Sequence, residues 1–507
     1  MAAPASPSSD DPETLKALLA EERAENERLR QIILAMQRHR FGRRAESLPE
    51  DQLLLGLEEA EQVEAAGFAD EENEPAKQEA RRAKRRTNRG ALPAHLPRVE
   101  CLVDIDSTAC PCCAGTLHRI GEDISERLDV VPAQFRALVI RRPRYACRAC
   151  GDAVVQAPAP VRLIEGGLPT DALVAQVLVS KYADHLPLYR QAQIFARQGV
   201  SLDRSTLADW VGRAAFLLRP VHERLLETLK RSGKLFADET TAPVLDPGRG
   251  RTKTGQLWAY ARDDRPWGGT DPPGVAYVYA PDRTAGRPIA HLCGFAGVLQ
   301  VDGYAAYESL AKGGAVRLAY CWAHVRRQFY DLAAASPIAT ETLSRIATLY
   351  RIESEIRGRS AEERRAARQE RSRPVVEALE VWLREKLALL SRKSNLADAI
   401  RYALSRWAGL SLFLDDGRVE IDSNTVERAI RPLTLNRKNA LFAGSDGGGE
   451  HWAVIASLIE TCKLIGVEPQ AYLTDVITRI VDGHPQRRLN DLLPWAYPST
   501  PALQAVA

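Results

Sequence analysis

Apolar and polar residues alternate along the middle of the chain in the way that β-strands alternate. Valine, tyrosine, leucine and alanine recur in these stretches, and glycine, proline or aspartate separates one from the next. The pattern predicts a sheet in the second half of the chain. The predicted strands lie in KLFADET (234–240), KTGQLWAYAR (253–262), GVAYVYAPDR (274–283), GVLQVDGYAAY (297–307) and the start of RLAYCWAHVRRQF (317–329), which then becomes helical.

Helical periodicity dominates most of the other apolar segments, so the pattern predicts an α/β fold. With 507 residues, 45% of them hydrophobic, the chain is long enough for several domains. The predicted divisions are an N-terminal amphipathic helix or short coiled coil (12–40), a charged linker (41–100), a zinc-binding domain (101–160), a helical domain (165–230), an α/β domain (231–465) with a helical insertion at about 338–400, and a small C-terminal helical unit (466–507).

The N-terminal helix has apolar residues at alternating spacings of three and four, which is a heptad seam. The seam is short, and Glu22 and Asn26 lie on the same stripe. Two interpretations follow, namely self-association through a coiled coil and packing of an amphipathic helix on its own protein. The apolar positions are Leu15, Leu19, Leu29, Ile33 and Met36.

Charge is nearly balanced over the whole chain, with a formal net charge of +3, but it is unevenly distributed. An acidic segment (57–74) is followed at once by a basic run (81–89). Such asymmetry is typical of a tail that contacts nucleic acid, and equally of a solvated linker. No apolar run reaches the roughly 18 residues of a membrane span, and the N-terminus lacks a signal-peptide pattern. We therefore expect a cytoplasmic protein with no membrane partner.

Two CxxC pairs predict a zinc site. Cys110 and Cys113 form the first pair, and Cys147 and Cys150 form the second, about 33 residues later. Four thiolates on two knuckles suit the tetrahedral geometry of zinc, and free thiols are the alternative. Because all four ligands would come from protein, the expected role is structural.

Two details complicate the assignment of the zinc ligands. Cys101 and Cys112 are spare thiols nearby, and Ala114 stands where a knuckle usually has glycine. Basic residues between the pairs could contact phosphate, or could form a solvated strand face. These residues are Arg136, Arg141, Arg142 and Arg144.

The stretch 187–215 has the layout of a helix-turn-helix, with a turn at Gly199 and a second helix capped by Ser201 or Asp203. Its second helix would project Arg204, Ser205 and Thr206 into a DNA groove. Two helices joined by a glycine turn are also common in helical domains that bind nothing. The expected core is Leu188, Ile194, Phe195, Val200, Leu207, Trp210 and Val211.

Three acids form the candidate chemical centre. Asp238 and Asp302 each follow an apolar strand pattern, so we expect both at strand ends in one sheet. Glu427 lies on a predicted helix that Asp422 or Ser423 could cap. Carboxylates gathered in this way provide oxygen ligands for magnesium or manganese. Each acid alone could be a turn residue or half of a surface ion pair, but three in this order, 64 and then 125 residues apart, favour a metal site.

Several other residues are candidates for the same site. His324 could contact a scissile phosphate or a water, or could be structural. Arg428 and Arg431 would face phosphate or hold Glu427 in place. Arg437 and Lys438 could bind DNA phosphates or form a solvated face. Residues 444–449 are glycine-rich but lack the context of a P-loop, so we expect a flexible turn near DNA.

The chain resembles transposases of the insertion sequence 66 family along nearly its whole length. Ser423, where many relatives have asparagine, and Ala114 are minor departures. The matching stretches are FGRRAESL (41–48), the CPCC and CRACG knuckles, KYADHLPLYRQAQIFARQGVSLDRSTLADW (181–210), LFADET (235–240), LQVDGYAAY (299–307), CWAHVRRQF (321–329), IDSNTVERAIRPLTLNRKNALFAGSDGGGEHWA (421–453) and LLPWAY (492–497).

The resemblance implies an RNase H-like (retroviral-integrase-like) catalytic core interrupted by a helical insertion, with Asp238, Asp302 and Glu427 as catalytic acids. Together with the acid pattern it predicts two-metal phosphoryl transfer with magnesium or manganese, in which Asp302 bridges both ions. The expected partners are double-stranded DNA (element ends and target), further copies of the chain and accessory proteins of the same element. We expect a bacterial protein that is associated with the nucleoid when bound.

Two other functions compete with transposition. A DNA-binding regulator would use the zinc and helix-turn-helix modules without catalysis, and the three acids argue against it. A structure-specific nuclease of the same fold would hydrolyse DNA without joining it, so strand-transfer products would separate the two.

Overall fold

The computed structural model describes residues 98, 112, 134–146, 154–164, 167–246 and 251–498. The chain divides into two compact units, Met1–Asp129 with Gln504–Ala507, and Val130–Leu503. Nearly all described residues belong to the second unit. The predicted N-terminal helix, almost all of the linker and the four predicted zinc cysteines lie outside the described residues.

A five-stranded mixed sheet forms the centre of the second unit, in the order β5-β4-β3-β6-β7. The pairs β5-β4 and β4-β3 are antiparallel, whereas β3-β6 and β6-β7 are parallel. The chain is therefore α/β, as predicted. The strands are β3 (Lys234–Asp246), β4 (Arg251–Arg262), β5 (Gly274–Ala280), β6 (Gly297–Val301) and β7 (Val316–Tyr320); a separate hairpin pairs β1 (Arg144–Ala146) with β2 (Val154–Gln156).

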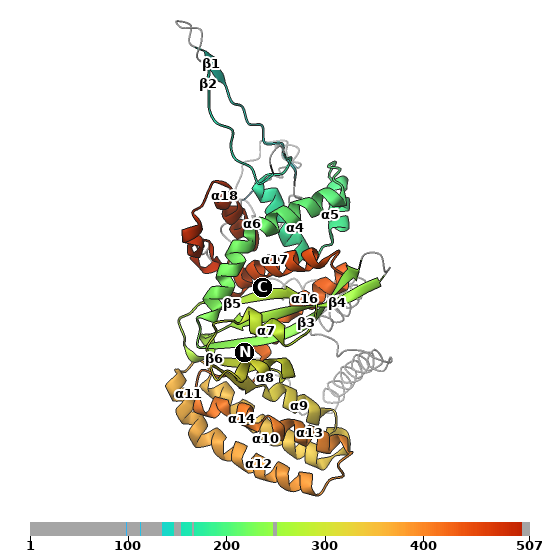
Figure 1. The fold of residues 1–507 in the computed structure, drawn as a ribbon, viewed down its shortest axis with the longest axis vertical. Helices are drawn as coiled ribbons and strands as arrows, with labels where there is room; N and C mark the ends of the chain where they lie inside the picture. Colours follow the sequence, from blue (N-terminus) through green and yellow to red (C-terminus); the bar gives the residue numbers. More distant parts are fainter. Residues whose placement is uncertain are drawn as a thin grey trace. The chain divides into compact units, whose positions relative to one another are not determined.

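Helices precede, interrupt and follow the sheet (Figure 1). The range predicted as a helical insertion, about 338–400, overlaps helices α10 to α13. The helices are α4 (Asp171–Tyr182), α5 (Leu188–Arg197), α6 (Arg204–Lys230), α7 (Gly286–His291), α8 (Ala305–Ala311), α9 (Trp322–Tyr330), α10 (Pro337–Ile356), α11 (Ala361–Ala367), α12 (Arg373–Ala388), α13 (Asn395–Ser405), α14 (Trp407–Leu410), α15 (Leu412–Asp415), α16 (Asn424–Ala440), α17 (Asp446–Leu464) and α18 (Pro469–Val481), with a π-helical turn η3 (Arg368–Ser372).

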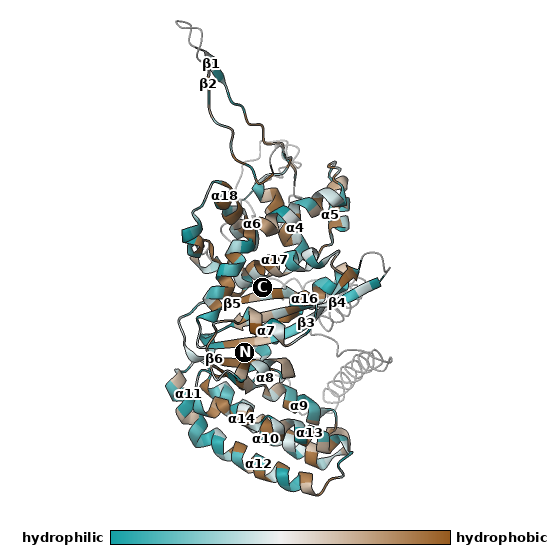
Figure 2. Ribbon diagram, viewed as in Figure 1, coloured by the Kyte–Doolittle hydropathy of each residue, from teal (hydrophilic) through white to brown (hydrophobic). Residues whose placement is uncertain are grey.

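Neighbouring residues of β6 belong to two different hydrophobic clusters. Leu299 packs in a cluster shared by the sheet with α4, α5, α6, α17 and α18. Val298 packs in a second cluster with α9 and the insertion helices. Successive side chains of a strand point to opposite faces, so the two faces of β6 are covered by different sets of helices. Apolar strands contrast with the strongly polar helix α11 in the hydropathy colouring (Figure 2).

Two local expectations are corrected by the fold. Asp238 does not end a strand, because β3 continues through Asp246 in antiparallel pairing with β4. The glycine-rich segment is not a flexible turn, because α17 begins at Asp446 and includes Gly447, Gly448 and Gly449 in its first turn. The Ser445 hydroxyl accepts a hydrogen bond from the Gly448 N–H and so caps this helix.

Among the residues that the structure describes, no helix has both the length and the apolar character needed to cross a membrane.

Candidate active site

The parallel register of β3 and β6 places the first two acids side by side. Phe236 pairs with Gln300 at the last matched position of the two strands. Asp238 lies two residues after Phe236, and Asp302 lies two residues after Gln300. The parallel register therefore places Asp238 and Asp302 opposite each other. Adjacent strands lie about 4.8 Å apart. The sequence prediction that both acids share one region of the sheet therefore agrees with the strand register, although Asp238 lies within a strand.

The Asp238 carboxyl is destabilised in its ionised form. Burial and then the negative charges of Asp302, Glu239 and Glu427 raise its pKa to about 8, against a hydrogen bond from the Glu239 N–H. Burial disfavours a charge that has no compensating partner, and like charges add to the effect. Asp302 and Glu427, the other two predicted acids, therefore both lie close enough to Asp238 for their charges to raise its pKa.

Asp302 occupies a tight turn directly after β6. Its Oδ1 accepts a hydrogen bond from the Tyr304 N–H at 2.8 Å. Gly303 has a φ of +103°, a conformation that favours glycine. The turn fixes the direction in which the Asp302 carboxylate leaves the sheet.

Glu427 lies in the first turn of α16, which packs against β3 and β4. Ser423 is the N-cap residue, but its hydroxyl donates to Glu427 Oε1 at 3.1 Å instead of capping a backbone N–H. Asp422 takes the capping role in part, because its Oδ1 accepts from the Asn424 N–H at 3.2 Å. The helix start therefore holds Glu427 next to the sheet.

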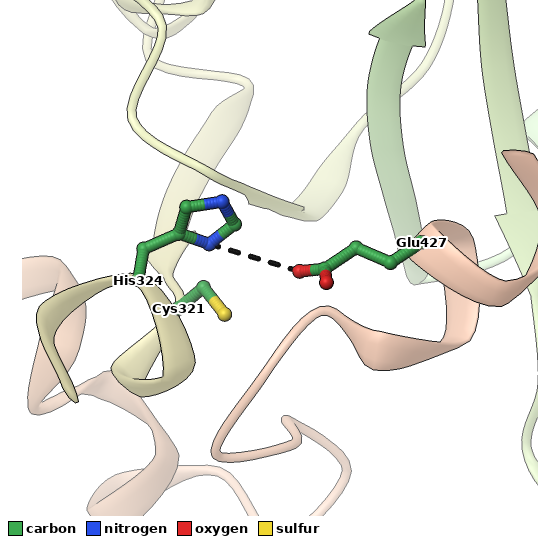
Figure 3. Close-up of side chains that lie close together, drawn as sticks. All are labelled: Cys321, His324 and Glu427. Carbon is green, nitrogen blue, oxygen red and sulfur yellow. Dashed lines mark ion pairs between the residues drawn. The ribbon is translucent and has the colours of Figure 1, made fainter. Parts of the chain in front are cut away.

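Cys321 and His324 face Glu427 from the other side (Figure 3). One ligand atom from each of the three lies within 4.8 Å of the others. His324 Nδ1 is 3.7 Å from Glu427 Oε1, too far for a hydrogen bond, and this buried nitrogen has no hydrogen-bond partner among the residues that the structure describes. The Cys321 thiol is buried, which raises its pKa to about 12. A ligand or ion that lies between the His324 nitrogen and the Glu427 carboxylate could bind to both.

A second acid, Glu239, lies next to Asp238 and was not predicted as a site residue from the sequence. The Glu239 side chain is 2% exposed and forms an ion pair with Arg283, while the Tyr307 hydroxyl donates to its Oε2 at 2.9 Å. Burial raises the pKa of Glu239. Arg283 also lies over the ring of Tyr304, 3.9 Å from its centroid. Only the DE pair in the sequence could have indicated this residue, since its partners lie 44 and 68 residues away.

The predicted DNA contacts on α16 differ in their surroundings. Arg428 and Lys438 are exposed, and Arg431 is half-buried. Arg437 Nη1 donates to the Thr241 carbonyl oxygen at 2.7 Å and to the hydroxyls of Thr240 and Thr241, so this residue already ties α16 to β3.

The predicted helix-turn-helix region contains the expected helices α5 and α6, joined by a turn in which Gly199 has a φ of +80°. Arg204 and Ser205 are exposed at the start of α6, and Thr206 is half-buried. Asp203 is the N-cap residue of α6. The predicted core is confirmed, since its seven residues are either buried in the first hydrophobic cluster or packed against it.

The chain matches four family models. Residues 166–451 match the model described as "Transposase IS66 family", and residues 457–495 match "IS66 C-terminal element". Residues 107–151 match the "zinc-finger binding domain of transposase IS66", a range that contains both CxxC pairs. Residues 28–101 match "Transposase C of IS166 homeodomain".

Relatives of the chain occur in Sinorhizobium fredii (strain NBRC 101917 / NGR234). Uncharacterized protein y4jD is 51% identical, with 82% of this chain and 84% of that protein covered. Uncharacterized protein y4qI is 48% identical, with 95% and 91% covered. Among solved structures, "Mos1 transposase paired-end complex with left transposon end" matches at 14% identity, covering 50% of this chain and 79% of that chain with a TM-score of 0.13.

Proposed function

This chain belongs to the IS66 family of transposases, and we propose that it cuts DNA at the ends of an insertion sequence and joins those ends to target DNA. The observation that carries the proposal is that Asp302 and Glu427 lie close enough to Asp238 for their charges to act on it. Burial first, and then the charges of Asp302, Glu239 and Glu427, raise the pKa of Asp238 to about 8. Divalent cations would compensate this cluster of negative charge.

The residues fit a divalent metal site. Three carboxylates supply hard oxygen ligands, and the unpartnered His324 nitrogen faces Glu427. Asp238, Asp302 and Glu427 would hold the ions, with Asp302 serving both and Asp238 and Glu427 one each. When bound, magnesium or manganese ions would activate the attacking water or DNA 3′-hydroxyl and stabilise the leaving oxygen. In this proposal the acids supply negative charge and position the ions, and they do not abstract protons.

The surrounding side chains orient this centre. Ser423 holds the Glu427 carboxylate by a hydrogen bond, and the Tyr304 N–H holds Asp302. His324 is a candidate to contact the scissile phosphate, a bound water or a cation. Family membership implies binding of a divalent metal and of zinc, and the metal at the acids is proposed to be magnesium or manganese.

We propose that the sheet and its flanking helices form an RNase H-like core. The strand order supports this assignment, because three antiparallel strands are followed by two parallel ones on the side of the first strand. The helical insertion falls between the second and third acids, where the resemblance to the family placed it.

DNA recognition is assigned to modules outside the acid cluster. Zinc held by Cys110, Cys113, Cys147 and Cys150 would stabilise one module. Groups at the start of α6 and on α16 would contact the DNA, namely Arg204, Ser205, Thr206, Arg428, Arg431, Arg437 and Lys438. Of these, Arg204, Ser205, Arg428 and Lys438 are exposed. We propose that the chain acts as a homo-oligomer on paired double-stranded ends, with accessory proteins of the same element, in the bacterial cytoplasm at the nucleoid.

The decisive experiment follows nicking and strand transfer on labelled element ends in magnesium. The full-length chain is expected to yield both products, and Asp302→Ala is expected to yield neither. Measurable end cleavage by Asp302→Ala would overturn the assignment of the acids. Cleavage without strand-transfer products would indicate a nuclease of this fold, and DNA binding without any cleavage would indicate a regulator.

A further inference from the structure

The helical insertion contacts the main chain on both sides of the acid cluster. Its helices lie between Asp302 and Glu427 in sequence and form the second hydrophobic cluster with one face of β6 and β7. Two sets of polar contacts leave this bundle, one toward the turn of Asp302 and one toward the segment that precedes α16.

The first set fixes the turn that carries Asp302. The Tyr402 hydroxyl on α13 donates to the Asp302 carbonyl oxygen at 2.9 Å. Arg406, at the end of α13, donates through Nη2 to the Gly303 carbonyl oxygen at 3.2 Å and lies over the Tyr402 ring. A Cβ at Gly303 would lie 2.5 Å from Arg406 Nε, so a larger residue here would displace the Arg406 side chain.

The second set holds Glu420, which lies seven residues before Glu427. Arg364 on α11 is 1% exposed, and its Nη1 donates to Glu420 Oε1 at 2.8 Å. Arg364 and Arg368 share the carboxylate of Glu353 on α10, and Arg368 bonds it through both Nε and Nη2, at 2.7 and 2.6 Å. This buried network of alternating charge ties the segment before α16 to the insertion.

Gln300 connects β6, the strand that leads into the Asp302 turn, with the segment that contains Glu420. Its side chain is fully buried in β6, two residues before Asp302. The side-chain amide donates to the carbonyl oxygens of Glu420 (2.7 Å) and Asp422 (2.9 Å), and its oxygen accepts from the Glu420 N–H at 3.2 Å. The strand that leads into the second acid therefore holds the segment that leads into the third.

We propose that the insertion, together with Gln300 on β6, sets the spacing of Asp302 and Glu427 for divalent metal binding. Tyr402 holds the turn of Asp302, Arg364 holds Glu420, and Gln300 ties the segment that contains Glu420 to the strand that leads into Asp302. This inference rests on the proposed metal-dependent function. The residues act through the acids and touch no substrate. Loss of such supporting contacts lowers metal affinity by about 10- to 100-fold in metalloproteins.

The test measures Mn²⁺ binding to the zinc-loaded full-length chain, by electron paramagnetic resonance of the free ion, without DNA. Gln300→Met keeps the size of the side chain and removes three hydrogen bonds, and it is expected to raise the Kd for Mn²⁺ at least tenfold. Tyr402→Phe removes one hydrogen bond and is expected to raise it about three- to tenfold. Asp302→Asn identifies the ions that the acids hold.

Matched controls separate positioning from stability. Tyr472→Phe removes a hydroxyl that donates to the Leu492 carbonyl oxygen at 2.7 Å, and Thr461→Val removes a hydroxyl bonded to both the N–H and the carbonyl oxygen of Val275. Thr461 lies on α17 and Tyr472 on α18, and their hydrogen-bond partners are Val275 on β5 and Leu492 in the C-terminal segment. The controls are expected to lower the melting temperature while leaving the Kd for Mn²⁺ within twofold of the wild type.

Wild-type affinity in Gln300→Met and Tyr402→Phe would overturn the positioning role, as would equal losses in the two controls. A wild-type chain that binds Mn²⁺ at the acids but cuts no DNA would overturn the proposed function alone, because the binding comparison would still decide the role of the insertion. A wild type with no Mn²⁺ bound at the acids would overturn both.

Discussion

At the scale of single residues, Asp238 lies where a negative charge is unfavourable. Burial and three neighbouring carboxylates raise its pKa to about 8. The fold therefore keeps a carboxyl where its charge is costly without a cation. Such concentrated negative charge is typical of sites that bind metal ions and of sites where function outweighs stability.

The pKa of Asp238 predicts a pH-dependent effect in the metal-free chain. Because the folded pKa is raised, this group supports the folded state below about pH 4 and loses that contribution as pH rises toward about 8. Asp238→Asn cannot ionise. Its melting temperature in chelator should match the wild type near pH 4 and exceed it increasingly up to about pH 8. Parallel melting curves over this range would contradict the prediction, and excess magnesium should reduce the difference.

Glu239 gives a second prediction, because its carboxylate is buried against Arg283. Arg283→Met should leave that carboxylate without its cation and lower the free energy of unfolding by about 2 kcal/mol at neutral pH, with a smaller loss at pH 4. Urea titration measures the difference. Arg287→Met is the control, since its pair with Asp282 is exposed on both sides and should contribute less to the free energy of unfolding.

Some residues of the candidate site could be predicted from the sequence and others could not. Asp302 and Glu427 could be picked out because one follows a strand pattern and the other begins a helix. Glu239 could not, because its burial depends on Arg283 and Tyr307 from later segments. Likewise, nothing in the local pattern indicates that Arg437 bonds to Thr241 on β3.

At the scale of elements, the strands and helices followed from periodicity, whereas their ends depended on partners. Asp238 was expected at a strand end because the apolar run stops there. The strand continues because β4 pairs with it through Asp246. The glycine run was expected to be a turn, yet Ser445 caps it as the start of a helix. Pairing and capping contacts thus override local propensity at both places.

The edge strand β5 is closed by a helix, which gives an element-scale prediction. The Ser457 hydroxyl on α17 accepts a hydrogen bond from the Tyr277 N–H at 2.8 Å, in a buried contact. Ser457→Ala leaves this N–H without its partner and should lower the free energy of unfolding by about 1–3 kcal/mol. Thr348→Ala removes an exposed hydroxyl bonded within α10 and should change it by less than about 0.5 kcal/mol. Equal midpoints in urea for both variants would refute the role of Ser457.

At the scale of the whole molecule, segments that were predicted to be separate domains share one hydrophobic core. The helices of 165–230 and the C-terminal helix α18 bury side chains in the same cluster as the sheet, as Leu178, Leu225 and Ile477 illustrate. Sequence patterns mark where helices begin and end but give no sign of which elements share a core. The boundaries at 230 and 465 therefore remain predictions, and the shared core makes them testable.

A fragment of residues 167–230 should not fold alone, because α4 and α6 bury their apolar faces against α17 and α18, and α6 also contacts β5. Val174, Leu218 and Leu229 are fully buried in the chain, and removal of these partners would expose apolar surface at about 25 cal/mol per Å². The fragment should show partial helicity, no cooperative melting transition and binding of a hydrophobic dye. A fragment of residues 130–498 retains every partner in this core and should melt cooperatively. Cooperative melting of the short fragment would instead show that the domain predicted at 165–230 folds independently. Helices α17 and α18 would then only pack against a domain that is already folded.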